Sequence, residues 1–321
     1  MSETRIFRPD ADGIKTATQL LKAGELVAFP TETVYGLGAD GTQGEAVAAI
    51  FEAKGRPSFN PLIIHVATLS QALDLIELPE PLLRLAKTFW PGPLTLVAPL
   101  KSGHPISDLV CAGLPTLAVR VPNNPVAQAL LTSFGGPVAA PSANPSGRIS
   151  PTRADHVVQG LSGKVAAILD GGPCPVGLES TILGMSLNGP VVLRPGGLAT
   201  EKIEAVLGHK LAENESSSIQ SPGQLASHYA PNAPIRLNQK SPLAQEAYLA
   251  FGNGEGRENE LDLSPSGDLR EAAANLFSHL RDLDALAKTA QLARISVAPI
   301  PNKDLGIAIN DRLKRAAAPK H

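Results

Sequence analysis

The chain has 321 residues, 43% of them hydrophobic and 18% charged, which is the composition of a folded protein long enough for two domains. Its formal net charge of -2 argues against a protein that binds nucleic acid through many phosphate contacts, although it allows a local cationic cleft. No apolar signal segment opens the chain, and no apolar run approaches the ~20 residues of a membrane helix, so we expect a cytosolic protein without membrane contact. Cys111 and Cys174 match no metal-binding spacing, and we expect free thiols, buried or in loops.

Over the first two-thirds of the chain, short apolar runs alternate with segments of helical spacing. The apolar runs predict strands at residues 26–30, 62–66, 94–100, 116–121, 137–141, 165–170 and 191–194. Helices are expected at residues 14–23, 45–53, 82–89, 126–134 and 201–207, the last with Thr200 as its N-cap. Because the strands are apolar along their length, this part predicts an α/β domain whose sheet is covered on both faces.

The character of the sequence changes after residue 208. Residues 209–233 are polar and lack periodicity, which indicates a linker. Beyond them, strands at residues 247–251 and 295–300 and helices at residues 269–280 and 305–317 predict a smaller α/β unit. We therefore expect one domain over residues 1–208, a linker over residues 209–233 and a second domain over residues 234–321.

Basic side chains follow several predicted elements, each beside a proline or glycine. Lys54 and Arg56 lie in KGRP, Arg120 lies in VRVP, and Arg194 lies in LRPGG. Ligands of open α/β sheets bind outside the carboxyl ends of the strands, where an arginine can clamp a carboxylate or a phosphate. We interpret the four residues as one anion-binding cleft. The alternative is a set of surface side chains beside turn prolines.

A loop over residues 141–152 carries hydroxyl and amide groups at Ser142, Asn144, Ser146 and Ser150. Such groups can hold phosphate oxygens, but an ordinary turn has the same composition. The chain has no P-loop, HExxH or GxSxG motif, and GNGEGR at residues 252–257 precedes no predicted helix, which argues against a dinucleotide fingerprint. Because His65 lies within the apolar run LIIHV, it is more typical of a core histidine than of a catalytic one.

Eight segments occur in order over residues 10–232: PTETVYGLGAD, KGRPSFNPLIIHV, WPGPLTLV, TLAVRVPNNP, PVAAPSANPSGRISPT, ESTIL, VVLRPGG and SPGQLASHYAP. Together they resemble the threonylcarbamoyl-AMP synthase family in its long, two-domain Sua5 form. GIAINDRLKRAAA, near the end of the chain, extends the resemblance more weakly to the second unit. The resemblance implies a twisted, mixed open sheet of the YrdC type, followed by a smaller α/β domain that is Rossmann-like.

The resemblance also implies a reaction, the condensation of L-threonine, bicarbonate and ATP to threonylcarbamoyl-AMP and pyrophosphate. A downstream threonylcarbamoyl transferase would use the product to modify tRNA. The N-carboxylate formed from threonine and bicarbonate and the α-phosphate of ATP are both anionic, so the enzyme's task would be positioning and charge neutralisation. Mg²⁺ is expected with ATP and pyrophosphate, and since no carboxylate cluster marks a metal site, phosphate and water would hold it.

The family's functional positions are carried over by motif. Catalytic roles fall on Lys54, Arg56, Ser142 and Asn144. Threonine contacts fall on Thr33, His65, Arg120, Ala140 and Ser180, and ATP contacts fall on Arg56, Asn60, Thr116, Ser142, Ser150, Arg194 and Tyr229. The resemblance makes SPGQLASHYAP a lid across the cleft, whereas the residues themselves also allow Tyr229 to be an aromatic anchor for the linker.

Two rival functions follow from the same residues. A cationic sheet could form an RNA-binding module, but the near-neutral charge and the aromatic content of 4% do not favour it, and we expect no stable binding of nucleic acid. A related carbamoyl-adenylating activity would use carbamoyl phosphate. It lacks support because the chain carries none of the extra domains of the hydrogenase-maturation proteins that have this activity.

Overall fold

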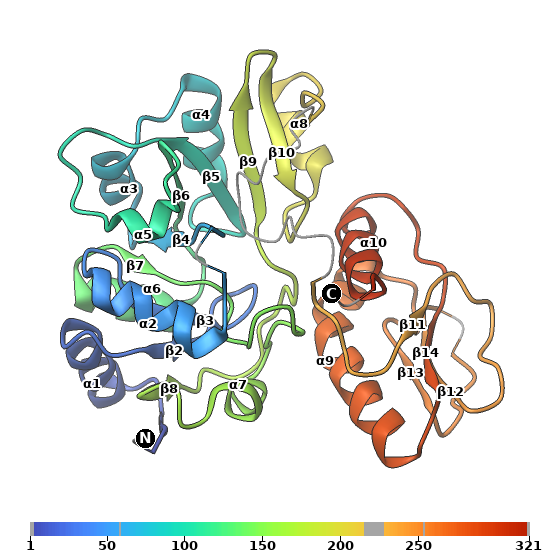
Figure 1. The fold of residues 1–321 in the computed structure, drawn as a ribbon. Helices are drawn as coiled ribbons and strands as arrows, with labels where there is room; N and C mark the ends of the chain where they lie inside the picture. Colours follow the sequence, from blue (N-terminus) through green and yellow to red (C-terminus); the bar gives the residue numbers. More distant parts are fainter. Residues whose placement is uncertain (1–2, 58, 215–227, 253, 320–321) are drawn as a thin grey trace.

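The computed structural model describes residues 3–57, 59–214, 228–252 and 254–319, and two sheets organise them (Figure 1). The strands of the first sheet are β1 (Arg5–Phe7), β2 (Val27–Phe29), β3 (Gly36–Asp40), β4 (Ile63–His65), β5 (Leu94–Pro99), β6 (Thr116–Arg120), β7 (Val138–Ala139), β8 (Ala167–Leu169), β9 (Thr181–Ser186) and β10 (Gly189–Arg194). The helices of this part are α1 (Ala11–Lys22), α2 (Gly44–Lys54), α3 (Leu69–Leu75), α4 (Glu80–Phe89), α5 (Asp108–Cys111), α6 (Pro125–Phe134), α7 (Ala154–Leu161) and α8 (Thr200–Leu207).

The first sheet is mixed, with the strand order β1-β8-β2-β3-β7-β4-β6-β5-β9-β10. Parallel pairs such as β4 with β6 alternate with antiparallel pairs such as β5 with β6. The expected class, a mixed open α/β sheet followed by a smaller α/β unit, is confirmed. Each predicted strand is present, but β1, β3 and β9 were not expected.

Alternation along the strands separates two faces of this sheet. Val27 and Phe29 of β2 pack in the core beneath α1 and α6, whereas Ala28 between them belongs to the large core on the opposite face, under α2, α4 and α7. Farther along, Ile63, Val97 and Ala118 extend the first face as a cluster that contains no helical residue. Within the described residues, no helix packs on this part of the first face, which we call the open face.

The second unit contains β11 (Ile235–Arg236), β12 (Glu246–Ala250), β13 (Glu260–Asp262) and β14 (Arg294–Val297), all parallel, with α9 (Leu269–Thr289) and α10 (Leu305–Ala316). Both helices lie between the four-stranded sheet and the first unit (Figure 1). Helix α9 continues beyond its expected end because Leu283 and Ala287 keep its apolar stripe in the core. The predicted linker lies partly outside the described residues, which omit 215–227.

Three smaller features complete the fold. The N-cap of α8 is Ala199 and not Thr200, whose hydroxyl donates to Glu201 within the first helical turn, so that expectation was wrong. Cys111 and Cys174 are both buried and unpaired, as expected. Across the described residues, no helix combines the length and the apolar character that a membrane span needs.

Candidate active site

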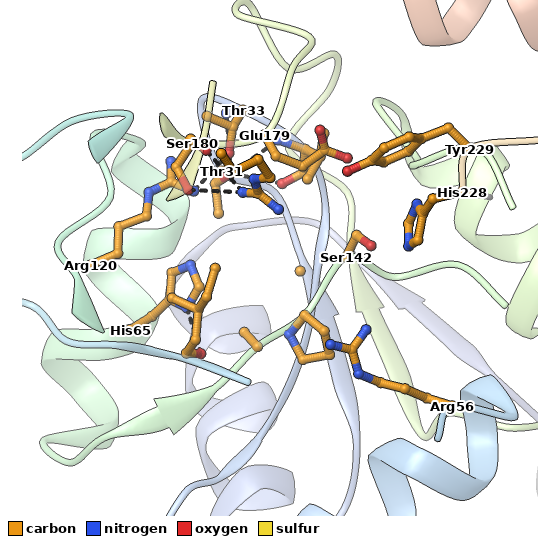
Figure 2. Close-up of a pocket in the computed structure, with 16 residues that line it drawn as sticks. Thr31, Thr33, Arg56, His65, Arg120, Ser142, Glu179, Ser180, His228 and Tyr229 are labelled. Atoms are coloured by element: carbon orange, nitrogen blue, oxygen red, sulfur yellow. Dashed lines mark hydrogen bonds between the residues drawn. The ribbon is translucent and has the colours of Figure 1, made fainter. Parts of the chain in front are cut away.

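A cavity lies on the open face of the first sheet (Figure 2). Its lining includes all the residues assigned to threonine, which are Thr33, His65, Arg120, Ala140 and Ser180. It also includes Arg56, Ser142, Arg194 and Tyr229 from the set assigned to ATP. Residues far apart in the sequence thus converge as the resemblance implies.

One end of the cavity is built around Arg120, which lies with Thr33 and Ser180 in Figure 2. Arg120 ends β6 and is paired in register with His65 of β4, so strand alternation sends both side chains to the open face. One guanidinium nitrogen lies 2.7 Å from Glu32 Oε1, and another donates to Thr33 Oγ1 at 2.8 Å. These contacts fix a buried guanidinium fork at the end of the strand.

His65 is uncharged in this setting. Burial, and then the neighbouring Arg120, lower the pKa of His65 to about 3. Its Nδ1 lies 3.3 Å from the carbonyl oxygen of Ile63. The residue is thus a buried histidine, as its apolar surroundings in the sequence suggested, and it also lines the cavity.

The other end of the cavity is cationic and is built around Arg56, with Ser142 and Tyr229 nearby in Figure 2. Arg56 follows the left-handed glycine that ends α2 and donates to the carbonyl oxygens of Asn60 at 3.3 Å and Pro61 at 2.9 Å. Burial lowers the pKa of Arg56 to about 10, which still leaves it charged at neutral pH. Because its partners are neutral carbonyls, this charge remains for a ligand.

Arg194 joins the two ends. It closes β10 and donates to the carbonyl oxygen of Ser180 at 2.9 Å, so it lies against the Arg120 end while facing the same cavity. The following turn depends on Gly196, where a Cβ atom would meet the carbonyl oxygen of Glu179 at 2.3 Å. The sequence LRPGG is therefore required for β10 to end against residues 179–180.

Lys54 and Asn144 do not line the cavity. The Lys54 ammonium donates to the carbonyl oxygens of Ser142 and Asn144, both at 2.5 Å, and burial followed by the charge of Arg56 lowers its pKa. The Asn144 amide donates to the carbonyl oxygens of Pro145 at 2.8 Å and Arg148 at 2.9 Å. Both side chains hold the loop that presents Ser142, so in this structure their contribution is to loop geometry.

Three residues assigned to ATP also lie outside the lining. Ser150 is buried and donates to Glu179 Oε1 at 2.5 Å. Asn60 is buried, and its Oδ1 has no partner within the described part of the chain. Thr116 begins β6, the strand that ends at Arg120, and pairs with Pro99. Contacts of these three residues with ATP stay predictions.

Glu179 and His228 line the cavity but were not assigned from the sequence. Burial by itself would raise the pKa of Glu179, but Arg312, Arg194 and the hydrogen bond from Ser150 outweigh it and lower the pKa to about 2. Burial lowers the pKa of His228 to about 3. Both residues stand next to assigned ones, in ESTIL and HYAP, and that adjacency was the only signal the sequence offered.

Tyr229 is both an anchor and part of the lining. Its ring stacks on Phe277 of α9 with a centroid distance of 5.5 Å, and the Arg312 guanidinium of α10 lies 5.2 Å from its centroid. Its φ of 63° is unusual for a bulky residue, and such strain is common at functional positions. The part of the expected lid that precedes His228 lies outside the described residues.

Carboxylates are scarce around the cavity. Glu179 is the one acidic residue in its described lining, and no group of three His, Cys, Asp or Glu residues suited to a metal ion occurs within the described ranges. A divalent cation at this site would therefore find most of its ligands on a phosphorylated substrate and in water.

Comparison with known proteins supports the expectation from the motifs. The Sua5–YciO–YrdC family profile, described as telomere recombination, matches residues 19–196, and the profile of the threonylcarbamoyl-AMP synthase C-terminal domain matches residues 198–318. The Threonylcarbamoyl-AMP synthase of Bacillus subtilis is 42% identical over 95% of this chain and 92% of its own length.

Two solved structures of the Pyrococcus abyssi protein share the whole fold. Its complex with L-threonine is 37% identical, covers 98% of this chain and 97% of that chain, and gives a TM-score of 0.87. A variant in which a His–Tyr pair is replaced by alanine gives a TM-score of 0.86 at 36% identity, over 99% of this chain and 96% of that chain. The chain therefore belongs to the two-domain, Sua5-type threonylcarbamoyl-AMP synthases.

Proposed function

We propose that the cavity condenses L-threonine, bicarbonate and ATP into threonylcarbamoyl-AMP and pyrophosphate. The observation that carries the assignment is the spacing of its cations, a guanidinium fork at Arg120 and a second charge at Arg56 across one cavity. The α-carboxylate of an amino acid and the phosphates of a nucleotide each need a positively charged partner, at positions that bring the reacting atoms together between them.

Threonine would occupy the Arg120 end. The fork of Arg120 suits bidentate binding of the α-carboxylate, and Glu32 holds the guanidinium in place before substrate enters. Neutral His65 and the hydroxyl groups of Thr33 and Ser180 can pair with the amino and hydroxyl groups of threonine. The complex of the Pyrococcus abyssi relative with L-threonine supports an amino-acid site in this fold.

The chemistry then proceeds in two steps. The threonine nitrogen attacks the carbon of bicarbonate, and water leaves to give an N-carboxylate. An oxygen of that carboxylate attacks the α-phosphorus of ATP, and the bond to the bridging oxygen breaks as pyrophosphate departs. Arg56 and Arg194 would offset the negative charge that gathers at the phosphorus.

No side chain has to act as a nucleophile in this scheme. Holding the N-carboxylate and the α-phosphate in contact can lower the barrier by ~7–11 kcal/mol. Mg²⁺ would enter as part of the MgATP substrate, because Glu179, the carboxylate of the described lining, is already engaged by Arg312 and Ser150. Lys54 and Asn144 would act indirectly, by fixing the loop that carries Ser142.

Tyr229 would help to close the cavity over the product. The mixed anhydride is labile to water, and a buried ring at the mouth limits the entry of water. The product would pass to a threonylcarbamoyl transferase that modifies tRNA. No contact of the described residues favours the RNA-binding alternative, since the arginines of the site are buried and not spread over a surface.

The proposal is tested by pyrophosphate release from ATP and Mg²⁺, with L-threonine and bicarbonate each present or omitted. Release that requires both, with threonylcarbamoyl-AMP identified by mass spectrometry, supports the reaction. Release that ignores threonine would refute it. Arg84→Lys is a matched control, because Arg84 contacts the Leu207 carbonyl away from the cavity and its replacement should leave release unchanged.

A further inference from the structure

One cation of the second unit reaches the candidate active site. Arg312 of α10 is fully buried, and its Nε donates to Glu179 Oε2 at 2.8 Å. The two residues are 133 positions apart in the sequence, and Glu179 belongs to the first unit. Helix α10 lies on the side of the second unit that faces the first (Figure 1).

Arg312 contacts two residues that line the cavity. Besides pairing with Glu179, its guanidinium lies 5.2 Å from the ring centroid of Tyr229. The second carboxylate oxygen of Glu179 accepts the hydroxyl of Ser150. Arg312 thereby joins a carboxylate and an aromatic ring of the site through a single side chain.

The position of Glu179 explains why such a cation is needed. A fixed carboxylate in the wall of a cavity that takes ATP repels the phosphates, because buried charges are poorly screened. The Arg312 guanidinium, which also donates to Asp311 Oδ2 at 2.6 Å, offsets this charge, and its removal would leave Arg194 and the Ser150 hydroxyl to do so.

We propose that Arg312 is a positioning residue for ATP, through which the second unit completes the active site. Its guanidinium cancels the charge of Glu179 and holds the Tyr229 ring against the cavity. The inference rests on the proposed function, because it takes ATP as the occupant of the cationic end. It gives the second unit a defined task, which is to supply the ion-pair partner of Glu179.

The test measures the Kd of MgATP by calorimetry and, separately, the KM for ATP, the KM for threonine and kcat. The variants are Arg312→Met, Arg312→Lys, Glu179→Gln and the double variant with Met and Gln. Arg236→Met is the matched control, because it breaks an Arg–Glu pair with Glu246 of the same unit, far from the cavity lining. Circular dichroism establishes that each variant is folded.

The proposal expects Arg312→Met to weaken MgATP binding by about tenfold or more, with the KM for threonine within about threefold of wild type. The double variant should recover the wild-type Kd to within about threefold, because the charge that repels ATP is gone. The Kd of Arg312→Lys for MgATP should lie between those of wild type and Arg312→Met, since an ammonium keeps the charge but lacks the forked geometry of the guanidinium.

A pH series adds a readout that a purely structural role would not move. Without Arg312, Glu179 still faces Arg194, His228 and the Ser150 hydroxyl, but it loses the largest contribution that lowers its pKa. Its pKa therefore rises relative to wild type, and MgATP binding by Arg312→Met should strengthen as the pH is lowered. Wild type should show no such gain, because its Glu179 has a pKa of about 2.

Three results would overturn the inference. They are an unchanged Kd in Arg312→Met, a double variant that binds no better than the single one, and an equal loss in Arg236→Met. If Arg312→Met does not fold, the Lys variant and the double variant decide the question by the same criteria. Binding of MgATP is measured without turnover, so a lack of threonine-dependent pyrophosphate release would count against the proposed reaction and not against this inference.

Discussion

Arg120→Lys should separate the binding of threonine from the binding of ATP. In the structure the guanidinium meets Glu32 at 2.7 Å and Thr33 Oγ1 at 2.8 Å, which leaves its fork oriented for a carboxylate. A lysine ammonium keeps the charge but cannot pair with Glu32 and also bind a carboxylate through two parallel bonds. A hydrogen bond to a charged group is worth ~1.5–3 kcal/mol, so the loss corresponds to a factor of about 10–150 in threonine affinity.

The assay is pyrophosphate release at varied threonine and saturating MgATP, with the reverse titration as a comparison. The KM for threonine should rise about 10–150-fold while the KM for ATP stays within about threefold, because Arg56 lies at the opposite end of the cavity. Urea unfolding shows whether stability is retained. A threonine KM within about threefold of wild type, or equal increases in both KM values, would refute the assignment of the Arg120 end to threonine.

Three further predictions follow from the same geometry. The pKa of His65 is depressed to about 3 in the folded protein, whereas the pKa of a histidine in the unfolded chain is ~6.5. The stability contributed by neutral His65 is therefore complete above about pH 6.5 and is lost as the pH falls toward 3. His65 should account for about 2 kcal/mol of the stability lost between pH 7 and about pH 5 in urea unfolding, so the loss should be smaller by that amount in His65→Gln. An identical pH dependence in that variant would contradict the prediction. Lys54→Met removes the ammonium that donates to the carbonyl oxygens of Ser142 and Asn144. We expect the free energy of unfolding in urea to fall by about 1–3 kcal/mol and kcat/KM to fall with it. Wild-type values of both quantities would contradict this prediction. Tyr229→Ala should release the adenylate faster and hydrolyse ATP wastefully, while Tyr229→Phe keeps the ring contact with Phe277. Unchanged product lifetime and turnover in the alanine variant would exclude the role in closure.

The sequence predicted the fold where residue type and environment agree. The runs around β4, β5 and β6 are apolar because both faces of these strands are mostly covered, and their existence followed directly. The segment GLGAD forms β3 although its two glycines and its aspartate are typical of a turn. Gly38 explains the difference, because a Cβ atom there would lie 2.9 Å from the ring of Phe29 on the neighbouring strand. That close approach is a tertiary property that no local pattern contains.

The site was predictable to the same extent. Cations after strand ends were expected to converge, and Arg56, Arg120 and Arg194 do line one cavity. Lys54 shows the limit of this reasoning, since its side chain turns under the loop and donates to backbone carbonyls. Its position in KGRP defines the residue type but not the direction of the side chain. Arg312 was beyond reach, because its role depends on how two separately encoded units dock.

The arrangement of buried charges explains how a chain with a net charge of -2 can hold an amino-acid carboxylate and the phosphates of a nucleotide. Both buried carboxylates near the cavity are matched by a buried guanidinium, Glu32 by Arg120 and Glu179 by Arg312. Arg56 instead donates to neutral carbonyls, so its charge acts on whatever enters. Removing one partner of a buried pair typically costs ~3–5 kcal/mol, because the other charge then lacks that partner. Selectivity for anions therefore comes from a few oriented cations inside the cavity, and the composition of the whole chain does not report it.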